Sequence, residues 1–129
     1  MATHHGKDGT VHIGSNVVAE ISSYSIDETA DTAEKTAMGD SSKSFEVGTT
    51  TATGSITCHW DETDSSGQGA MTAGASVTLN LYPEGADSGD TFATLTALIT
   101  SVGVSVDMGS IVERSFGWQA TGGVTWSTV

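Results

Sequence analysis

The stretch TATGSITCHW (residues 51–60) alternates between two kinds of side chain. One set is small or apolar and the other is polar and mostly hydroxyl-bearing. The first set is Ala52, Gly54, Ile56, Cys58 and Trp60, and the second is Thr51, Thr53, Ser55, Thr57 and His59. Successive side chains of a β-strand point to opposite faces of a sheet. The alternation therefore predicts a strand with one buried face and one hydroxyl-rich face.

The same period of two recurs on both sides of this stretch. Residues 8–27 have the pattern of a β-hairpin, and alternating runs follow at residues 76–85 and 97–122. We expect seven or eight strands in a mainly β fold, an antiparallel β-sandwich or half-open barrel. The expected core side chains are Trp60, Met71, Leu79, Leu81, Val104, Phe116 and Trp118.

Composition limits the function. The chain has 129 residues, the size of one domain, and a formal net charge of −12 with only four basic residues. Those basic residues do not cluster, so the charge disfavours tight binding to nucleic acid, and an anionic membrane surface would repel the chain. A single cysteine excludes an intramolecular disulfide, and no apolar run could span a bilayer. The N-terminal stretch lacks an apolar signal segment, so we expect synthesis in the cytoplasm.

Residues 27–50 differ from the rest of the chain because they hold six acids and two lysines but few apolar residues. We interpret them as a long polar loop that cannot fold alone and that orders against a neighbouring subunit. The residues expected to make that contact are Asp31, Lys35, Met38, Lys43 and Phe45. Met38 and Phe45 would be its apolar anchors, and the two lysines would pair with acids across the contact.

The acidic segment WDETDSSGQGAM (residues 60–71) resembles a functional site. An EF-hand reading that starts at Glu62 fails because Ala73 stands where a bidentate carboxylate is needed. Zinc is disfavoured because Cys58 and His59 are adjacent on a strand and point to opposite faces. Carboxylate catalysis lacks a wall that would separate two pKa values, and no nucleophile or phosphate-binding motif occurs. We expect no catalytic residue, no metal and no cofactor.

A short helix over residues 61–74 is the favoured interpretation of this segment. Asp61 would cap the helix, and Glu62 and Asp64 would place negative charge near its positive N-terminus. Gly74 would end it.

The order of these parts resembles the major tail tube proteins of phages with long non-contractile tails and of the related gene transfer agents. The resemblance rests on four stretches: YSIDETADTAEKTAMGDSSKSF (24–45), GSITCHWDETDSSGQGAM (54–71), VTLNLYPEG (77–85) and VERSFGWQATGGVTW (112–126). It implies the tail-tube fold, in which a sandwich or half-open barrel is flanked by one helix. It also implies six-membered rings that stack into a virion tube for genome ejection.

The resemblance implies partners as well. We expect self-association, contacts with tape measure, tail terminator and distal tail proteins, and DNA that passes without tight binding. Residues 1–129 would form a single tail-tube domain without the C-terminal immunoglobulin-like domain of some members. A secreted or surface β-sandwich that binds carbohydrate or acts as an adhesin is the alternative function, and an enzyme is the least favoured.

The composition is consistent with a DNA conduit, because carboxylates repel phosphates and small hydroxyls offer few charged donors. Polar strand faces could equally meet solvent on a monomeric sandwich. If the chain forms a tube, we expect its channel to be lined by Ser101, Ser105, Asp107, Glu113 and Ser115.

Overall fold

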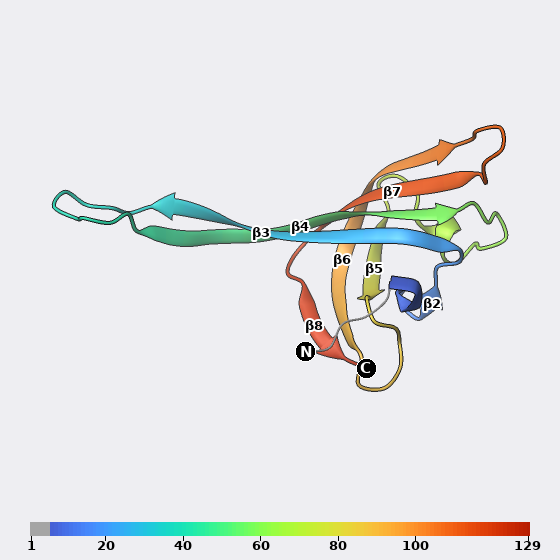
Figure 1. Ribbon diagram of the computed structural model, residues 1–129, viewed down its shortest axis with the longest axis horizontal. Coiled ribbons are helices and arrows are strands. Elements are labelled where there is room, and N and C mark those ends of the chain that lie inside the picture. The colour runs from blue at the N-terminus through green and yellow to red at the C-terminus, as the bar shows by residue number, and fades with distance from the viewer. Residues whose placement is uncertain (1–5) are drawn as a thin grey trace.

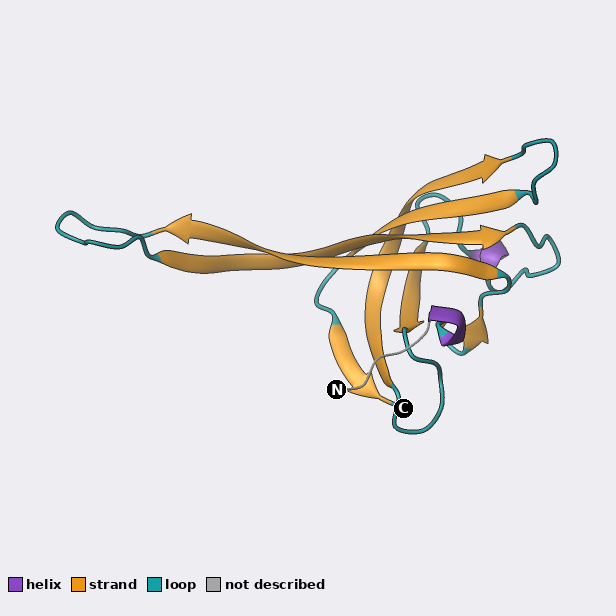
Figure 2. Cartoon of the chain, viewed as in Figure 1, coloured by secondary structure: helices purple, strands orange, loops and turns teal. Residues whose placement is uncertain are grey.

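The computed structural model describes residues 6–129, and within them eight strands and two short 3₁₀ turns alternate with loops (Figure 2). The strands are β1 (Thr10–Ile13), β2 (Asn16–Val17), β3 (Ile21–Glu34), β4 (Phe45–His59), β5 (Ser76–Tyr82), β6 (Thr91–Ser105), β7 (Glu113–Ala120) and β8 (Thr125–Thr128). The 3₁₀ turns are η1 (Gly6–Asp8) and η2 (Gln68–Ala70). The mainly β, antiparallel prediction is confirmed. No helix of residues 6–129 is long and apolar enough to cross a membrane.

All eight strands belong to one sheet, in the order β2-β1-β5-β6-β7-β4-β3, with β8 paired to the first residues of β6. In Figure 1 the long β3–β4 ribbon runs across the direction of β5 and β6, so the sheet bends strongly between its two halves. A single core cluster joins Tyr24 and Ile26 of β3 to Val11 of β1 and Leu79 of β5. Since these strands come from opposite ends of the strand order, the sheet curls into a half-open barrel around its own apolar face.

The core follows the period-two pattern of the sequence. β6 buries every second residue from Ala93 to Ile99, and β7 buries Phe116 and Trp118. Five of the seven expected core residues are buried, with at most 2% of each exposed: Met71, Leu79, Leu81, Phe116 and Trp118.

Two expected core residues are wrong. Trp60 is 46% exposed and Val104 is 51% exposed. Trp60 follows directly on the last residue of β4, and Val104 is the penultimate residue of β6. Both fall on the apolar face of their strands by the alternating pattern. They lie at the end of the sheet, however, where no opposing strand covers them. Alternation identifies the face of a side chain and not its depth along the strand.

The expected long loop over residues 27–50 is also wrong. β3 extends to Glu34 and β4 begins at Phe45, so only residues 35–44 connect them. The two strands pair in register as far as Glu34 and Phe45, with an irregularity near Asp31. Strand pairing satisfies the backbone without an apolar core, and threonine-rich sequence favours extended backbone.

The expected α-helix over residues 61–74 does not form, and the segment holds only the single 3₁₀ turn η2. Two serines and two glycines disfavour a continuous helix here. The side chain of Asp64 instead accepts hydrogen bonds from backbone amides of the loop, which competes with helical pairing.

Gly54 allows neighbouring strands to approach its backbone very closely within the core. A Cβ at this position would overlap the carbonyl oxygen of Ser25 on β3 and lie 2.5 Å from Cζ2 of Trp118 on β7. The indole ring of Trp118 therefore packs directly against the backbone of β4. Backbone cannot move aside as a flexible side chain can, so only glycine fits where β3, β4 and β7 meet.

We expect Gly54→Ala to lower the free energy of unfolding by about 1–3 kcal/mol, the usual cost of overpacking a core. Denaturant unfolding followed by tryptophan fluorescence measures the change. Gly123→Ala is the matched control, because a Cβ there meets no atom within 4 Å. Equal stability of the two variants would contradict the packing of Trp118 on Gly54.

Cys58 gives a second test of the fold. Its side chain is fully buried, and burial raises the pKa of its thiol from 9.0 to about 11. The unfolded chain ionises this thiol near pH 9 and the folded chain does not, so the thiol contributes stability that is lost as pH rises from about 9 to about 11.

We expect Cys58 to react slowly with a thiol reagent at about pH 8 in the native protein and rapidly after unfolding. Above pH 9, the free energy of unfolding should decrease less in Cys58→Ala than in the wild type. The decrease above pH 10 should persist in that variant, because burial also raises the pKa of Tyr24 to about 12. Rapid native labelling would show that the thiol is not enclosed.

Candidate assembly and channel surfaces

The face of the sheet opposite the core is rich in hydroxyls. Three cross-strand rows of β4, β7 and β6 form what we term the hydroxyl face. The rows are Ser55–Gly117–Ser101, Thr57–Ser115–Gly103 and His59–Glu113–Ser105. Glu113 is the one formally charged side chain in these rows at neutral pH, and Arg114 has the opposite parity, on the core side. The rows are therefore neutral or acidic.

Glycine shapes the hydroxyl face. A Cβ at Gly117 would lie 2.5 Å from Oγ of Ser101, and a Cβ at Gly103 would lie 3.1 Å from Oγ of Ser115. Each glycine thus leaves room for the serine of the neighbouring strand. In these two rows, short side chains beside glycine keep the surface close to the backbone.

The structure brings four of the five channel candidates together. Ser101, Ser105, Glu113 and Ser115 are all exposed on the hydroxyl face. Asp107 is not among them, because β6 ends at Ser105 and Asp107 lies in the turn beyond it.

The candidates did not include the β4 hydroxyls Ser55 and Thr57, which complete two of the rows. Their alternation was visible in the sequence, but only the strand order places them beside β7.

The β3–β4 ribbon extends away from the body of the molecule and forms its far end (Figure 1). From the pair Asp27–Thr53 to the pair Glu34–Phe45 it spans eight residues of β3 and nine of β4, about 25 Å of strand. Except for Ala52, the ribbon's residues in this span are exposed on both faces. An unsupported two-stranded ribbon is marginally stable in water, so this ribbon has the properties of a contact arm.

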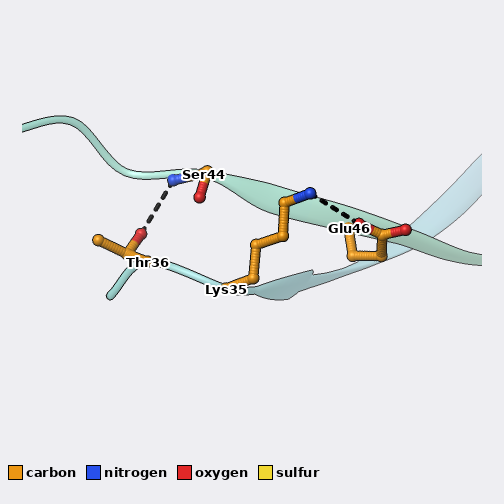
Figure 3. Close-up of polar contacts among 4 residues, drawn as sticks. All are labelled: Lys35, Thr36, Ser44 and Glu46. Atoms are coloured by element: carbon orange, nitrogen blue, oxygen red, sulfur yellow. Dashed lines mark hydrogen bonds and ion pairs between the residues drawn. The ribbon is translucent and has the colours of Figure 1, made fainter. Parts of the chain in front are cut away.

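Polar contacts close the far end of the ribbon (Figure 3). Nζ of Lys35 lies 2.9 Å from Oε2 of Glu46, and the amide of Ser44 donates to Oγ1 of Thr36 at 2.9 Å. The Lys35 ammonium is thus paired within its own ribbon rather than free for another subunit. The ion pair is exposed, so it organises the end of the ribbon more than it stabilises the fold.

The other residues expected to make the contact are all exposed, but they have different surroundings. Met38 lies in the connection, and Phe45 begins β4 with 53% of its surface exposed. Lys43 is also in the connection, whereas Asp31 lies within β3 and its Oδ2 accepts from Oγ1 of Thr49 at 3.4 Å. The structure therefore places all five residues on the ribbon and its connection.

The acidic segment after β4 is a structural anchor. The carboxylate of Asp64 accepts hydrogen bonds from the amides of Gly67 and Gln68, both at 3.1 Å, and of Ala19 at 2.8 Å. Asp61 accepts from the amide and hydroxyl of Thr63. The two carboxylates are therefore engaged in shaping the loop and tying it to the chain before β3. Within residues 6–129, no group of three or more His, Cys, Asp or Glu side chains could hold a metal ion.

Gln68 completes this anchor and was missed by the sequence reasoning, which treated it as part of a helix. Its side chain is fully buried. Nε2 donates to the carbonyls of Ala19 and His59, both at 2.9 Å, and Oε1 accepts from the amide of Asp61 at 3.1 Å. One amide group thus joins three backbone segments.

No protein-family model matches the sequence, and a search of curated proteins gives no significant match. Solved structures do match. A chain in the tail of an empty gene transfer agent particle, refined with C6 helical symmetry, superposes with a TM-score of 0.78 at 15% identity, covering 98% of this chain and 100% of that one. The SPP1 tail tube gives a TM-score of 0.75 at 13% identity, covering 98% and 80%.

A chain of the tube-terminating cap of the anti-feeding prophage matches with a TM-score of 0.71 at 19% identity, covering 100% of this chain and 93% of that one. Because all three matches extend over nearly the whole chain, they show that it has the tail-tube fold. The fold expected from the sequence is confirmed, apart from its flanking helix.

We expect Gln68→Leu to lower the free energy of unfolding by about 2 kcal/mol or more, because two carbonyls and one amide lose their buried partner. Glu62→Gln, which changes an exposed neighbour in the same loop, should alter it by less than about 0.5 kcal/mol. Chemical denaturation of both variants tests this. If Gln68→Leu left the free energy of unfolding unchanged, the loop would not depend on this side chain.

Proposed function

We propose that this chain is the structural subunit of a virion tail tube. Six copies close into a ring, rings stack, and the genome passes through the channel during ejection. The observation that supports this most is the match of nearly the whole chain to subunits of tails and tubes, at TM-scores of 0.71–0.78. The fold carries no enzymatic role in this proposal, and the subunit acts through the surfaces that it presents to its copies.

Open sheet edges support ring formation. The strand order ends at β3 on one side and at β2 on the other, and an edge strand presents unpaired amides and carbonyls. A second copy can pair with such an edge and continue the sheet. Repetition around six copies would then produce a continuous inner wall without free edges.

The hydroxyl face would line the channel. A wall with Glu113 and several short hydroxyls repels phosphates and offers no ammonium or guanidinium that could hold them. The repulsion reaches about 8 Å at physiological salt, which centres the duplex and removes points of adhesion. Ser101, Ser105 and Ser115 would form the neutral part of this wall. Asp107 would lie at its rim rather than on the wall, because it belongs to the turn after β6.

The β3–β4 ribbon would make the contact between rings. It extends beyond the core, exposes both faces and carries the apolar residues Met38, Phe45 and Val47 at its far end. Proteins that terminate or initiate the tube, and a tape measure within it, would be the remaining partners of the subunit. The virion tail would be its location.

Replacing residues 31–49 by Asn-Gly tests the role of the ribbon. Ala30 and Thr50 pair directly, so a two-residue turn between them closes a shorter hairpin without disturbing the core. We expect a subunit that unfolds at a similar denaturant concentration and cannot form tubes. Light scattering and electron microscopy measure the assembly. Normal tubes of the shortened chain would contradict an inter-ring role for the ribbon.

Reversing the charge at Glu113 tests the channel. Glu113→Lys would place a cation in every subunit of every ring, so a weak attraction for phosphate would be repeated along the tube. We expect tubes to form and DNA passage to slow, most strongly at low salt.

Glu20→Lys is the control, because Glu20 is an exposed acid outside the hydroxyl face. If Glu113→Lys tubes eject DNA at the normal rate at low salt, the hydroxyl face does not line the channel. If they fail to form while Glu20→Lys tubes assemble, Glu113 lies at a contact between subunits.

A further inference from the structure

Large exposed apolar side chains concentrate at two ends of the molecule. Among residues 6–129 twelve are exposed, and eight of these belong to two groups. The first group, which we term the ribbon tip, is Met38, Phe45 and Val47 with the connection 35–44. The second, which we term the end patch, is Trp60, Val104, Val106, Met108 and Ile111. The two largest exposures, 103% for Met38 and 104% for Met108, lie in different groups.

The residues of the end patch lie on adjoining segments of the structure. The amide of Trp60 donates to the carbonyl of Val112 at 2.9 Å, which joins the residue after β4 to the β6–β7 connection. Trp60 and Val112 also line a shallow depression together with Asp61 and Glu62. The patch therefore combines exposed apolar side chains with an acidic border.

The ribbon tip has the complementary character. Residues 35–47 hold two lysines and two acids, in a chain whose net charge is −12, and the Lys35 ammonium pairs with Glu46, so Lys43 is the cation that the tip presents. Half of the four basic residues of the chain thus lie in this one connection. Opposite charges around two apolar surfaces favour one register of contact and disfavour contact between two like ends.

The two surfaces cannot meet within one chain. In Figure 1 the ribbon tip lies at one extreme of the long axis, and the β6–β7 connection lies toward the other. A contact between them must join two copies head to tail, and such a contact leaves a free tip at one end of the pair and a free patch at the other. Heterologous contacts of this kind repeat without limit when they do not close, which suits a stacked assembly.

We propose that the end patch is the acceptor for the ribbon tip of a second copy in the adjacent ring. The proposal rests on the function proposed above and adds the partner surface of the ribbon. Met38 and Phe45 pack against Met108, Ile111 and Trp60. The Lys43 ammonium faces the carboxylates of Asp61 and Glu62. Burial of both apolar groups removes two thirds of the large exposed apolar side chains from water.

Cross-linking between different copies tests the contact. A Met38→Cys chain and a Met108→Cys chain are prepared separately, mixed, assembled and treated with a short bismaleimide, which joins two thiols. The native Cys58 thiol is buried and does not compete. We expect a cross-linked dimer in the mixture and little in either single variant. Val17→Cys mixed with Met38→Cys is the matched control, because Val17 is exposed but outside the end patch.

Capping tests the head-to-tail geometry. A Met108→Asp/Ile111→Asp chain keeps its tip and loses its acceptor, whereas the chain shortened at residues 31–49 keeps its acceptor and loses its tip. Alone, each should form rings that do not stack. Mixed, they should give pairs of rings and no longer tubes, because only one contact can form.

The outcomes separate this inference from the proposed function. If wild-type chains form tubes while the Met38–Met108 cross-link is absent, or while the Met108→Asp/Ile111→Asp chain stacks normally, the acceptor lies elsewhere and the inference is overturned alone. If wild-type chains stay monomeric at high concentration, the tube function and the acceptor both fail. The cross-link together with paired rings supports both.

Discussion

The structure depends on one constraint: a single sheet must bury its own apolar face. Within residues 6–129 no long helix and no second sheet covers it. The sheet therefore curls until β1 and β5 meet β3 and β4 across the core, and Trp118 fills the space between them. The indole ring fits only because Gly54 presents bare backbone. Curling buries the apolar face and leaves the opposite face exposed.

That division connects the fold to the proposed function. Period-two alternation gives every central strand one apolar and one hydroxyl-bearing face, so burial of the first dictates exposure of the second. The hydroxyl face is low, acidic and free of lysine and arginine in its three rows, as a surface past which DNA slides must be. Apart from Ala52, the ribbon and the end patch contribute no buried side chain to the core, which is consistent with surfaces kept for contact between copies.

The sequence allowed much of this to be predicted. Alternation around Ile56 and Phe116 identified the strands and their faces without knowledge of the strand order. It could not identify the depth of Trp60, because depth depends on what lies across the sheet. Residues 27–50 were misinterpreted because a ribbon with no core lacks the apolar signal by which strands are recognised. The helix prediction failed because the Asp64 carboxylate accepts hydrogen bonds from amides of its own loop and from a distant one. The distant amide is that of Ala19, 45 residues away.

Electron cryomicroscopy of the assembled protein, at a resolution that separates strands, tests the central claim most directly. We expect six-fold rings whose inner wall is the hydroxyl face, with Ser101, Glu113 and Ser115 directed at the axis and the core face of the same strands turned away from the channel. A tube whose inner wall is formed by other strands, or an assembly in which the hydroxyl face lies on the outer surface, would contradict it.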